Sequence, residues 1–201
     1  MKYIRLALVG WFFGVRVPAA IALGMAVTAA GAPPLRETLV YKRVGALEIK
    51  ADVYRPAGEA HTRPVFVYFH GGSLINGGRQ QIEKHPFKEA FLAAGFVVVS
   101  PDYRLAPESK VPAIIEDLED LFLWIRERGP ALFGADPVRL ASGGGSAGGY
   151  LTLVAGYRVQ PRPFAMIAEM SYGDLIGAWQ LRPSIHPPHY TDSRLDEAAI
   201  G

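Results

Sequence analysis

The sequence predicts one α/β domain with a mostly parallel sheet that opens with an antiparallel hairpin. Three observations predict this fold class. Segments with the period of strands alternate with segments that have the period of helices. Several strand segments are continuous apolar runs, which are typical of parallel strands buried on both faces. A glycine-rich segment around Ser146, residues 141–150, lies where such a strand is followed by a helix.

The first elements are strands. Alternating polar and apolar residues predict strands over 38–44 and 47–54, which a turn at Gly45 joins into a hairpin. The runs at 64–69 and 96–100 are apolar throughout, so we expect them to be strands buried inside the sheet. Because the hairpin comes first and buried strands follow, the sheet should be antiparallel at one side and parallel elsewhere.

Two helices follow from apolar residues spaced three and four apart. The first covers 87–94 and ends at Gly95. The second covers 112–128, and Gly129 and Pro130 are expected to end it. Four acidic residues in this second helix are expected on its solvated face: Glu116, Asp117, Glu119 and Asp120.

The carboxyl-terminal part begins with a short strand over 138–141 and a helix over 147–157. A further buried strand is predicted over 164–170. From there the periodicity fades, and residues 172–201 are expected to form a lid-like or irregular tail rich in proline and histidine. The α/β domain as a whole is assigned to residues 33–201.

Residues 1–32 are predicted to be a targeting segment. They contain Lys2, Arg5 and Arg16 before an apolar run that ends in small residues, the pattern of a secretory signal peptide. The alternative is a membrane anchor, because the run from Leu6 to Ala30 is almost wholly apolar and spans roughly the 20 residues that a bilayer requires. We therefore expect an exported protein, secreted or periplasmic, or one anchored to the membrane through this segment.

Composition excludes several classes of protein. The chain has 201 residues, half of them hydrophobic, which suits one domain with a substantial core. It has no cysteine, so disulfides and thiol nucleophiles are excluded. Residues 1–32 hold three basic residues and no acid, so the remainder carries a formal charge of −1 although the whole chain carries +2. A nucleic-acid partner is therefore not expected.

Ser146 is predicted to be a nucleophile. It is the serine of Gly144-Gly145-Ser146-Ala147-Gly148, which fits the G-x-S-x-G pattern of a sharp turn from strand to helix. Glycines two residues before and after the serine allow the neighbouring backbone to approach closely. The competing interpretation is a structural one, in which Ser146 caps the amino terminus of the following helix.

Backbone donors for an oxyanion are predicted at two places. The strand over 64–69 ends in His70-Gly71-Gly72, and a polar loop over 73–79 follows. In a parallel sheet this loop and the serine share the edge where the strands end, which is where sites form in such sheets. The N–H groups of Gly71, Gly72 and Ala147 are thus candidates for an oxyanion hole.

Three motifs in this order resemble the α/β-hydrolase superfamily, in its hormone-sensitive-lipase-like and BD-FAE-like esterase branch: His70-Gly71-Gly72, residues 102–107 with the sequence DYRLAP, and residues 144–149. The resemblance covers about residues 37–175. It implies a serine carboxylesterase that acts on small-molecule esters through an acyl-enzyme on Ser146, without metal or organic cofactor. It implies an architectural role for the DYRLAP segment, and none in catalysis for Asp102 and Arg104.

The sequence departs from that family at three places. Ser73 stands where a third glycine is frequent, and Gly145 where one branch has an acid. The larger departure is the carboxyl end, because few residues follow Ser146. We expect strands of the family fold to be missing there, in an apparently truncated hydrolase.

The catalytic acid and base are not assigned by the sequence. Asp174 followed by His186 or His189 has the chain order of serine, acid and histidine. Both histidines lie in a proline-rich segment with no strand ahead of them, so an impaired fragment or pseudoenzyme is the main alternative. Two later carboxylates are also open as the acid: Asp192 and Asp196.

A dinucleotide-binding protein is the second alternative. Gly143, Gly145 and Gly148 also fit a G-x-G-x-x-G fingerprint between a strand and a helix. Glu169 lies about 20 residues farther on, where an acid would bind the ribose. This interpretation leaves His70-Gly71-Gly72 unexplained. A metal site is not predicted, because the five histidines are scattered.

Overall fold

A six-stranded sheet forms the centre of the protein. The computed structural model describes residues 35–58 and 62–173. The strands of the sheet are β1 (Leu35–Val44), β2 (Leu47–Arg55), β3 (Arg63–Phe69), β4 (Val97–Pro101), β5 (Ala135–Gly145) and β6 (Ala165–Glu169). They are ordered β1-β2-β4-β3-β5-β6 across the sheet.

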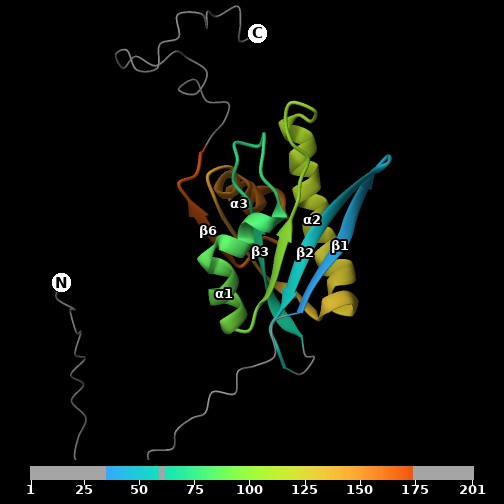
Figure 1. Cartoon of the computed structure of the whole chain (residues 1–201), viewed down its shortest axis with the longest axis vertical. Coiled ribbons are helices and arrows are strands. Elements are labelled where there is room, and N and C mark those ends of the chain that lie inside the picture. Colours follow the sequence, from blue (N-terminus) through green and yellow to red (C-terminus); the bar gives the residue numbers. More distant parts are fainter. Residues whose placement is uncertain (1–34, 59–61, 174–201) are drawn as a thin grey trace, which may run out of the picture. The chain divides into compact units, whose positions relative to one another are not determined.

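Helices cover both faces of this sheet (Figure 1). They are the 3₁₀-helix η1 (Arg79–Lys84) and the α-helices α1 (Pro86–Ala93), α2 (Val111–Phe133) and α3 (Ala147–Arg158). Helices α2 and α3 pack on one face, and η1 with α1 packs on the other. The result is the three-layer α/β arrangement that alternating strands and helices predict.

The pairing of the strands confirms the expected mixed sheet. The β1–β2 hairpin is antiparallel and turns at Gly45, and β2 pairs antiparallel with β4. The pairs β3–β4, β3–β5 and β5–β6 are parallel. The carboxyl ends of β3, β4, β5 and β6 therefore lie along one edge, where the loops after them meet.

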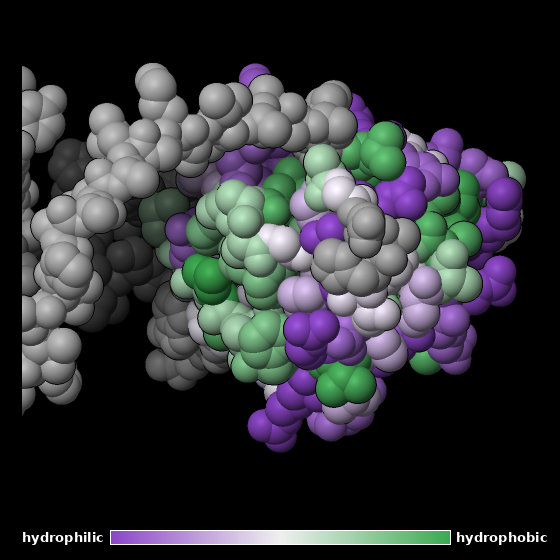
Figure 2. Space-filling model, turned by 90° about the horizontal axis from the view of Figure 1, so that it is seen from below, coloured by the Kyte–Doolittle hydropathy of each residue, from purple (hydrophilic) through white to green (hydrophobic). Residues whose placement is uncertain are grey.

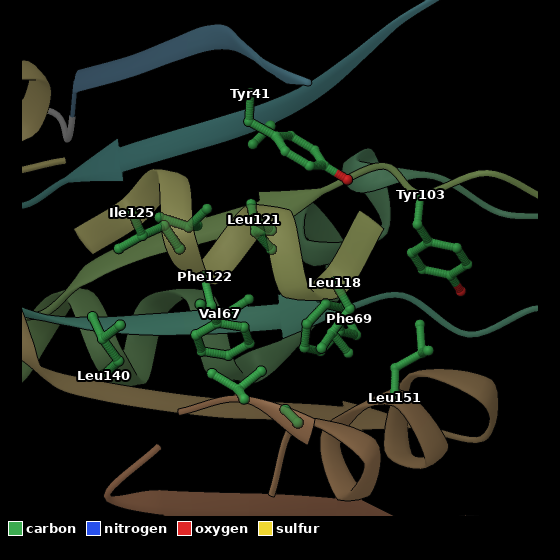
Figure 3. Packing of buried hydrophobic residues seen from close by; sticks show 14 of the residues in the cluster. Tyr41, Val67, Phe69, Tyr103, Leu118, Leu121, Phe122, Ile125, Leu140 and Leu151 are labelled. Atoms are coloured by element: carbon green, nitrogen blue, oxygen red, sulfur yellow. The ribbon is translucent and has the colours of Figure 1, made fainter. Parts of the chain in front are cut away.

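Two hydrophobic clusters hold the layers together. The larger lies between the sheet and helices α2 and α3, where Phe69 and Leu140 meet Phe122 and Leu121 (Figure 3). The smaller lies under α1, where the rings of Phe66 and Phe91 stack with centroids 3.7 Å apart. Since β3 and β4 contribute side chains to both clusters, they are buried on both faces, as the apolar runs predict.

Helix α2 extends past the end that the sequence predicts. Gly129 and Pro130 lie inside it, and it ends at Gly134, which has the left-handed φ of 71° typical of a helix-ending glycine. Packing explains the extra turn, because Phe133 is buried and its ring lies 5.5 Å from that of Trp124. A side chain at 129 would lie 2.8 Å from Cβ of Ala135, so glycine allows this close approach. Tertiary packing therefore overrides the local helix-breaking signal.

The prediction for Asp117 was wrong. Its side chain is fully buried instead of solvated, and its Oδ1 lies 2.8 Å from Nζ of Lys42 and 2.8 Å from Nη2 of Arg104. Arg104 also donates its backbone N–H to Asp117 at 2.9 Å. The carboxylate therefore ties α2 to β1 and to the loop after β4, which only the folded arrangement brings together.

Strand β6 was expected to be buried, and this was also wrong. Met166 and Ile167 are 44% and 39% exposed, and Phe164 just before the strand is 58% exposed. Within the described residues, β6 pairs with β5 alone and lies at the edge of the sheet. An apolar strand at an edge has the same composition as a central one, so the sequence did not distinguish them.

Apolar side chains are also spread over the rest of the surface. Seen from below, the molecule shows a broad green area beside purple ones (Figure 2). Exposed hydrophobic residues are expected in any globular protein, because there is too little polar surface to cover it. Among residues 35–58 and 62–173, no helix combines the length and hydropathy needed to cross a bilayer.

Candidate active site

Ser146 lies at the junction of β5 and α3, in an unusual backbone conformation. Its φ is 55° and its ψ is −120°, which non-glycine residues rarely adopt and which costs about 1–3 kcal/mol. Its N–H donates to the carbonyl of Glu169 at 2.9 Å, which fixes the turn to the end of β6. Although Ser146 occupies the N-cap position of α3, its side chain makes no capping hydrogen bond. The structural interpretation as a helix cap is therefore not supported.

The glycines around Ser146 let three backbone segments pack closely. An added Cβ on Gly148 would overlap the carbonyl oxygen of Phe69 and lie 2.9 Å from that of His70. An added Cβ on Gly144 would overlap the same oxygen of Phe69. The start of α3 therefore lies directly against the end of β3, as the glycine spacing predicts.

The loop after β3 adjoins the turn at Ser146. A Cβ built on Gly71 would lie 3.2 Å from the carbonyl oxygen of Gly145 and 3.7 Å from Cβ of Ser146. The structure thus brings together Gly71 and Ser146, which are 75 positions apart in the sequence. This juxtaposition follows from the parallel pairing of β3 and β5.

The same loop has an unusual backbone. Gly72, Ser73 and Leu74 have consecutive positive φ angles of 120°, 56° and 62°. The turn is closed by the carbonyl of Gly72, which accepts the N–H of Ile75 at 2.9 Å, and buried Leu74 anchors it. Within the described part of the chain, the N–H groups of Gly72, Ser73 and Ala147 have no acceptor.

The ring and the carbonyl of His70 are both held by contacts with neighbouring residues. Its ring stacks on Tyr103 with centroids 4.1 Å apart, and the Tyr103 hydroxyl donates to the His70 carbonyl at 2.8 Å. The ring nitrogen Nδ1 lies 2.8 Å from the carbonyl oxygen of Gly71, so it carries a proton and donates. Figure 3 shows the Tyr103 side chain pointing from the loop after β4 toward the segment after β3.

Protonation of His70 should oppose folding. Burial lowers the pKa of His70 below 6.5, although the Gly71 carbonyl and Asp102 favour the charged form. The unfolded chain therefore takes up this proton at a higher pH than the folded protein, so the free energy of unfolding falls as pH drops below about 6.5. We expect urea unfolding between pH 7.5 and 5.5 to show a larger loss in wild type than in His70→Asn. Equal losses would contradict the prediction.

Asp102 and Arg104 have structural contacts that agree with an architectural role. Asp102 accepts the backbone N–H of Arg79 at 2.9 Å and also binds its guanidinium. Arg104 binds the buried carboxylate of Asp117. Both charges are used within the fold, so neither is directed at Ser146.

A second histidine lies near the other side of the turn. Nδ1 of His85 accepts the N–H of Phe87 at 3.3 Å, and its Nε2 lies 3.4 Å from Oε2 of Glu169. Burial first, and the charge of Glu169 second, raise the pKa of the neighbouring Tyr68. The backbone carbonyl of Glu169 accepts the N–H of Ser146 at 2.9 Å, so the end of β6 is tied to the turn at Ser146.

Sequence reasoning missed two residues of this site. Gln81 accepts the N–H of Gly71 on its Oε1 at 3.2 Å, and Tyr103 supports His70 from the loop after β4. Tyr103 lies in the DYRLAP motif, so the motif contained a signal for it. Gln81 belongs to η1 and lies two residues beyond the loop that the sequence predicts over 73–79, and no pattern singled it out.

Four predictions fall outside the described residues. The first two are the targeting segment 1–32 and the tail, of which only residues 172 and 173 are described. The other two are the base and the acid of the triad, whose candidates are His186, His189, Asp174, Asp192 and Asp196. The geometry therefore concerns only the nucleophile and the oxyanion donors, and the acid and base stay predictions.

Comparison with known proteins identifies the family. The chain is 42% identical over 109 residues to the carboxylic ester hydrolase LipN of Mycobacterium tuberculosis, covering 53% of this chain and 28% of that protein. It is 41% identical over 112 residues to the carboxylesterase NlhH of the same species, covering 55% and 34%. The chain thus spans about a third of the length of these curated relatives.

A solved structure and a family profile agree with these relatives. Native esterase 2 of Thermogutta terrifontis superposes with a TM-score of 0.53 at 34% identity, covering 58% of this chain and 42% of that one. The profile of the α/β-hydrolase fold family matches residues 66–188, which include the His70 loop and the turn at Ser146. The chain therefore belongs to the α/β-hydrolase family, as its resemblance to hormone-sensitive-lipase-like esterases predicts.

Proposed function

We propose that this protein is a serine hydrolase that cleaves carboxylic esters through an acyl-enzyme on Ser146. The observation that carries the proposal is the conformation of Ser146, with a φ of 55° and a side chain that caps no helix N–H. A residue held in a strained conformation without a structural hydrogen bond is typical of a functional site. The adjacent loop of backbone donors supports the same interpretation.

The proposed reaction has two steps. Ser146 Oγ attacks the ester carbonyl, the C–O bond to the alcohol breaks, and the alcohol leaves with a proton. Water then attacks the acyl-enzyme, which releases the carboxylic acid and returns the proton to Ser146. In each step the negative charge on the carbonyl oxygen needs N–H donors about 2.7–3.1 Å away.

The proposed donors are the N–H groups of Gly71, Gly72 and Ala147. Those of Gly72 and Ala147 have no acceptor within the described residues, and Ala147 also begins α3, whose positive end favours an anion. The N–H of Gly71 is bonded to Gln81, so Gly71 would serve as a donor only by exchanging that partner. Each donor typically contributes about 3 kcal/mol to transition-state stabilisation.

The relatives support the choice of an ester as substrate. Two curated relatives are named as a carboxylic ester hydrolase and a carboxylesterase. The esterase 2 of Thermogutta terrifontis, at 33% identity, has been solved as a protein phosphorylated by paraoxon. An organophosphorus reagent is therefore a suitable probe for an activated serine in this chain as well.

The nucleophile can be tested with a fluorophosphonate probe and with p-nitrophenyl esters of short acyl chains. We expect labelling and ester hydrolysis in wild type, and a loss of at least about a thousandfold in Ser146→Ala, because loss of a triad serine costs up to about a millionfold in turnover. Ser171→Ala is a matched control, since Ser171 lies against Gly149 at the other side of the same turn. Labelling that survives Ser146→Ala would contradict the assignment.

An impaired fragment or pseudoenzyme is the alternative that a structural observation favours. Of the histidines described, His70 donates to Gly71 and His85 lies at Glu169, and neither has a hydrogen bond to Ser146. No labelling of wild type by the probe would support this alternative. Dinucleotide binding is tested separately by titrating NADH, and we expect its fluorescence to stay unchanged.

Export through residues 1–32 is also part of the proposal. It rests on their basic and apolar pattern alone. Fractionation of cells that produce the full chain should place the protein outside the cytoplasm or in the membrane.

A further inference from the structure

We propose that Gln81 is a positioning residue that holds the loop of oxyanion donors in its working conformation. This inference rests on the proposed serine hydrolase function. The side-chain amide of Gln81 contacts both backbone polar groups of one residue, Gly71. Its Oε1 accepts the Gly71 N–H at 3.2 Å, and its Nε2 donates to the Gly71 carbonyl over a longer distance, 3.5 Å.

The contact has the geometry of a neighbouring strand. A strand beside Gly71 would offer one carbonyl acceptor and one N–H donor, and the Gln81 amide offers the same pair. Strand β3 ends at Phe69, so the sheet itself no longer guides the chain at Gly71. The side chain of Gln81 thus supports the backbone at Gly71, beyond the end of β3.

The loop needs such support because its conformation is unfavourable. The positive φ angles of Ser73 and Leu74 are rare for residues with side chains, because Cβ then lies too close to a carbonyl oxygen. Conformations of this kind persist only when the surrounding contacts determine them. His70 Nδ1 and Gln81 Nε2 both point at the Gly71 carbonyl, which fixes the direction of the following Gly72 N–H.

Gln81 itself stands on a well-anchored element. The backbone N–H of Arg79 donates to Asp102 at 2.9 Å, and the carbonyl of Arg79 accepts from Ser100 Oγ at 2.8 Å. The guanidinium of Arg79 binds Asp52, which is fully buried, through Nε at 3.0 Å. Ile82, one residue after Gln81, is fully buried. Helix η1 is therefore fixed to β2 and β4 from below, and this fixes the starting point of the Gln81 side chain.

Gly77 completes the contact from the other side. A Cβ on Gly77 would lie 2.5 Å from the Gly71 carbonyl oxygen, 2.5 Å from His70 Nδ1 and 2.8 Å from Gln81 Nε2. The backbone at Gly77 therefore packs against all three groups and leaves them little room to move. The exposed side chain of Gln81 is thus part of a closely packed polar cluster under the loop, although its residue type and exposure give no hint of it.

The arrangement also has a chemical consequence. Because Gln81 occupies the N–H of Gly71, the unpaired N–H groups nearest to Ser146 in this loop belong to the next two residues, Gly72 and Ser73. Disturbing Gln81 should therefore change how the loop stabilises charge that develops in the transition state. It should change the binding of the uncharged ground state much less.

The test uses the full chain with matched substitutions at two adjacent glutamines of η1. Gln81→Met removes both hydrogen bonds at nearly constant size, and Gln81→Glu replaces the donor to the Gly71 carbonyl with a repelling oxygen. Gln80→Met and Gln80→Glu are the controls, because the side chain of Gln80 is exposed and has no hydrogen bond within the described residues. Fluorophosphonate labelling is followed over a range of probe concentrations, which separates the rate constant of inactivation from the binding constant of the probe.

We expect the inactivation rate constant to fall at least about tenfold in Gln81→Met and further in Gln81→Glu. The binding constant should stay within about twofold, and both Gln80 variants should match wild type. We also expect hydrogen exchange of the Gly71 amide to become at least about tenfold faster in Gln81→Met alone. This second measurement does not depend on catalysis.

The outcomes separate the two proposals. Labelling of wild type at Ser146 with equal rate constants in all four variants would overturn the role of Gln81 and leave the hydrolase proposal standing. Unchanged exchange at Gly71 in Gln81→Met would also overturn it. Wild type that is never labelled would overturn the hydrolase proposal, and with it any role of Gln81 in that reaction.

Discussion

Gly148→Ala is expected to lower the free energy of unfolding by more than about 3 kcal/mol, a large part of the 5–15 kcal/mol that stabilises a typical domain. The added methyl group would overlap the carbonyl oxygen of Phe69 and lie 2.7 Å from its carbonyl carbon and 2.9 Å from the carbonyl oxygen of His70. These are backbone atoms of the central strand β3 and the segment after it, so they cannot turn away as a side chain could. Helix α3 would have to move off the sheet.

Urea unfolding followed by circular dichroism would measure this loss. Gly173→Ala is the matched control, because an added Cβ there meets no atom within 4 Å, and its stability should stay within about 0.5 kcal/mol of wild type. A Gly148→Ala protein within about 1 kcal/mol of wild type would show that the turn at Ser146 is looser than the structure indicates. Because the same methyl group displaces the start of α3, we also expect it to abolish labelling of Ser146.

Asp117→Ala is expected to cost about 3–5 kcal/mol, the range for removing one partner of a buried ion pair. The substitution would leave Lys42 and Arg104, both 14% exposed, without the fully buried carboxylate between them. It would also remove the acceptor for the backbone N–H of Arg104. The loss should therefore exceed that of an ordinary surface ion pair.

Asp120→Ala gives a sharp comparison for this prediction. Asp120 lies on the same helix and also binds Lys42, at 2.6 Å, but its side chain is 47% exposed. Water screens and replaces such a contact, so we expect a loss below about 1 kcal/mol. Equal losses for the two variants, measured by urea unfolding at pH 7, would show that burial of Asp117 does not decide its contribution.

Much of the fold could be predicted because its signals are local. The hairpin around Gly45 and the apolar runs that became β3 and β4 were confirmed. The location of the candidate active site could be predicted as well. The parallel strands β3 and β5 bring the loop at Gly71 and the turn at Ser146 to one edge of the sheet. Roles in catalysis remain predictions, since they depend on groups that the described residues do not include.

One of the errors could have been avoided from the sequence. Asp117 lies three residues after Ile114 and four before Leu121, so the helical period itself puts it on the apolar face. An acid there indicates a buried carboxylate with cationic partners, which is what the structure has. The true end of α2, the exposure of β6 and the contact of Gln81 with Gly71 had no such signal, since each depends on packing or on a position in the sheet.

The order of the strands has a consequence for how the protein folds. Strand β2 takes β4 as its neighbour and not β3, which directly follows it in the sequence. The amino-terminal hairpin therefore cannot join the sheet until the chain has been synthesised through Pro101. Pairings over such a separation are slow, because the loop between the strands must close before the contacts stabilise it. The hairpin should thus dock after β3 and β4 have formed their parallel pair, because those two strands are closer to each other in the sequence.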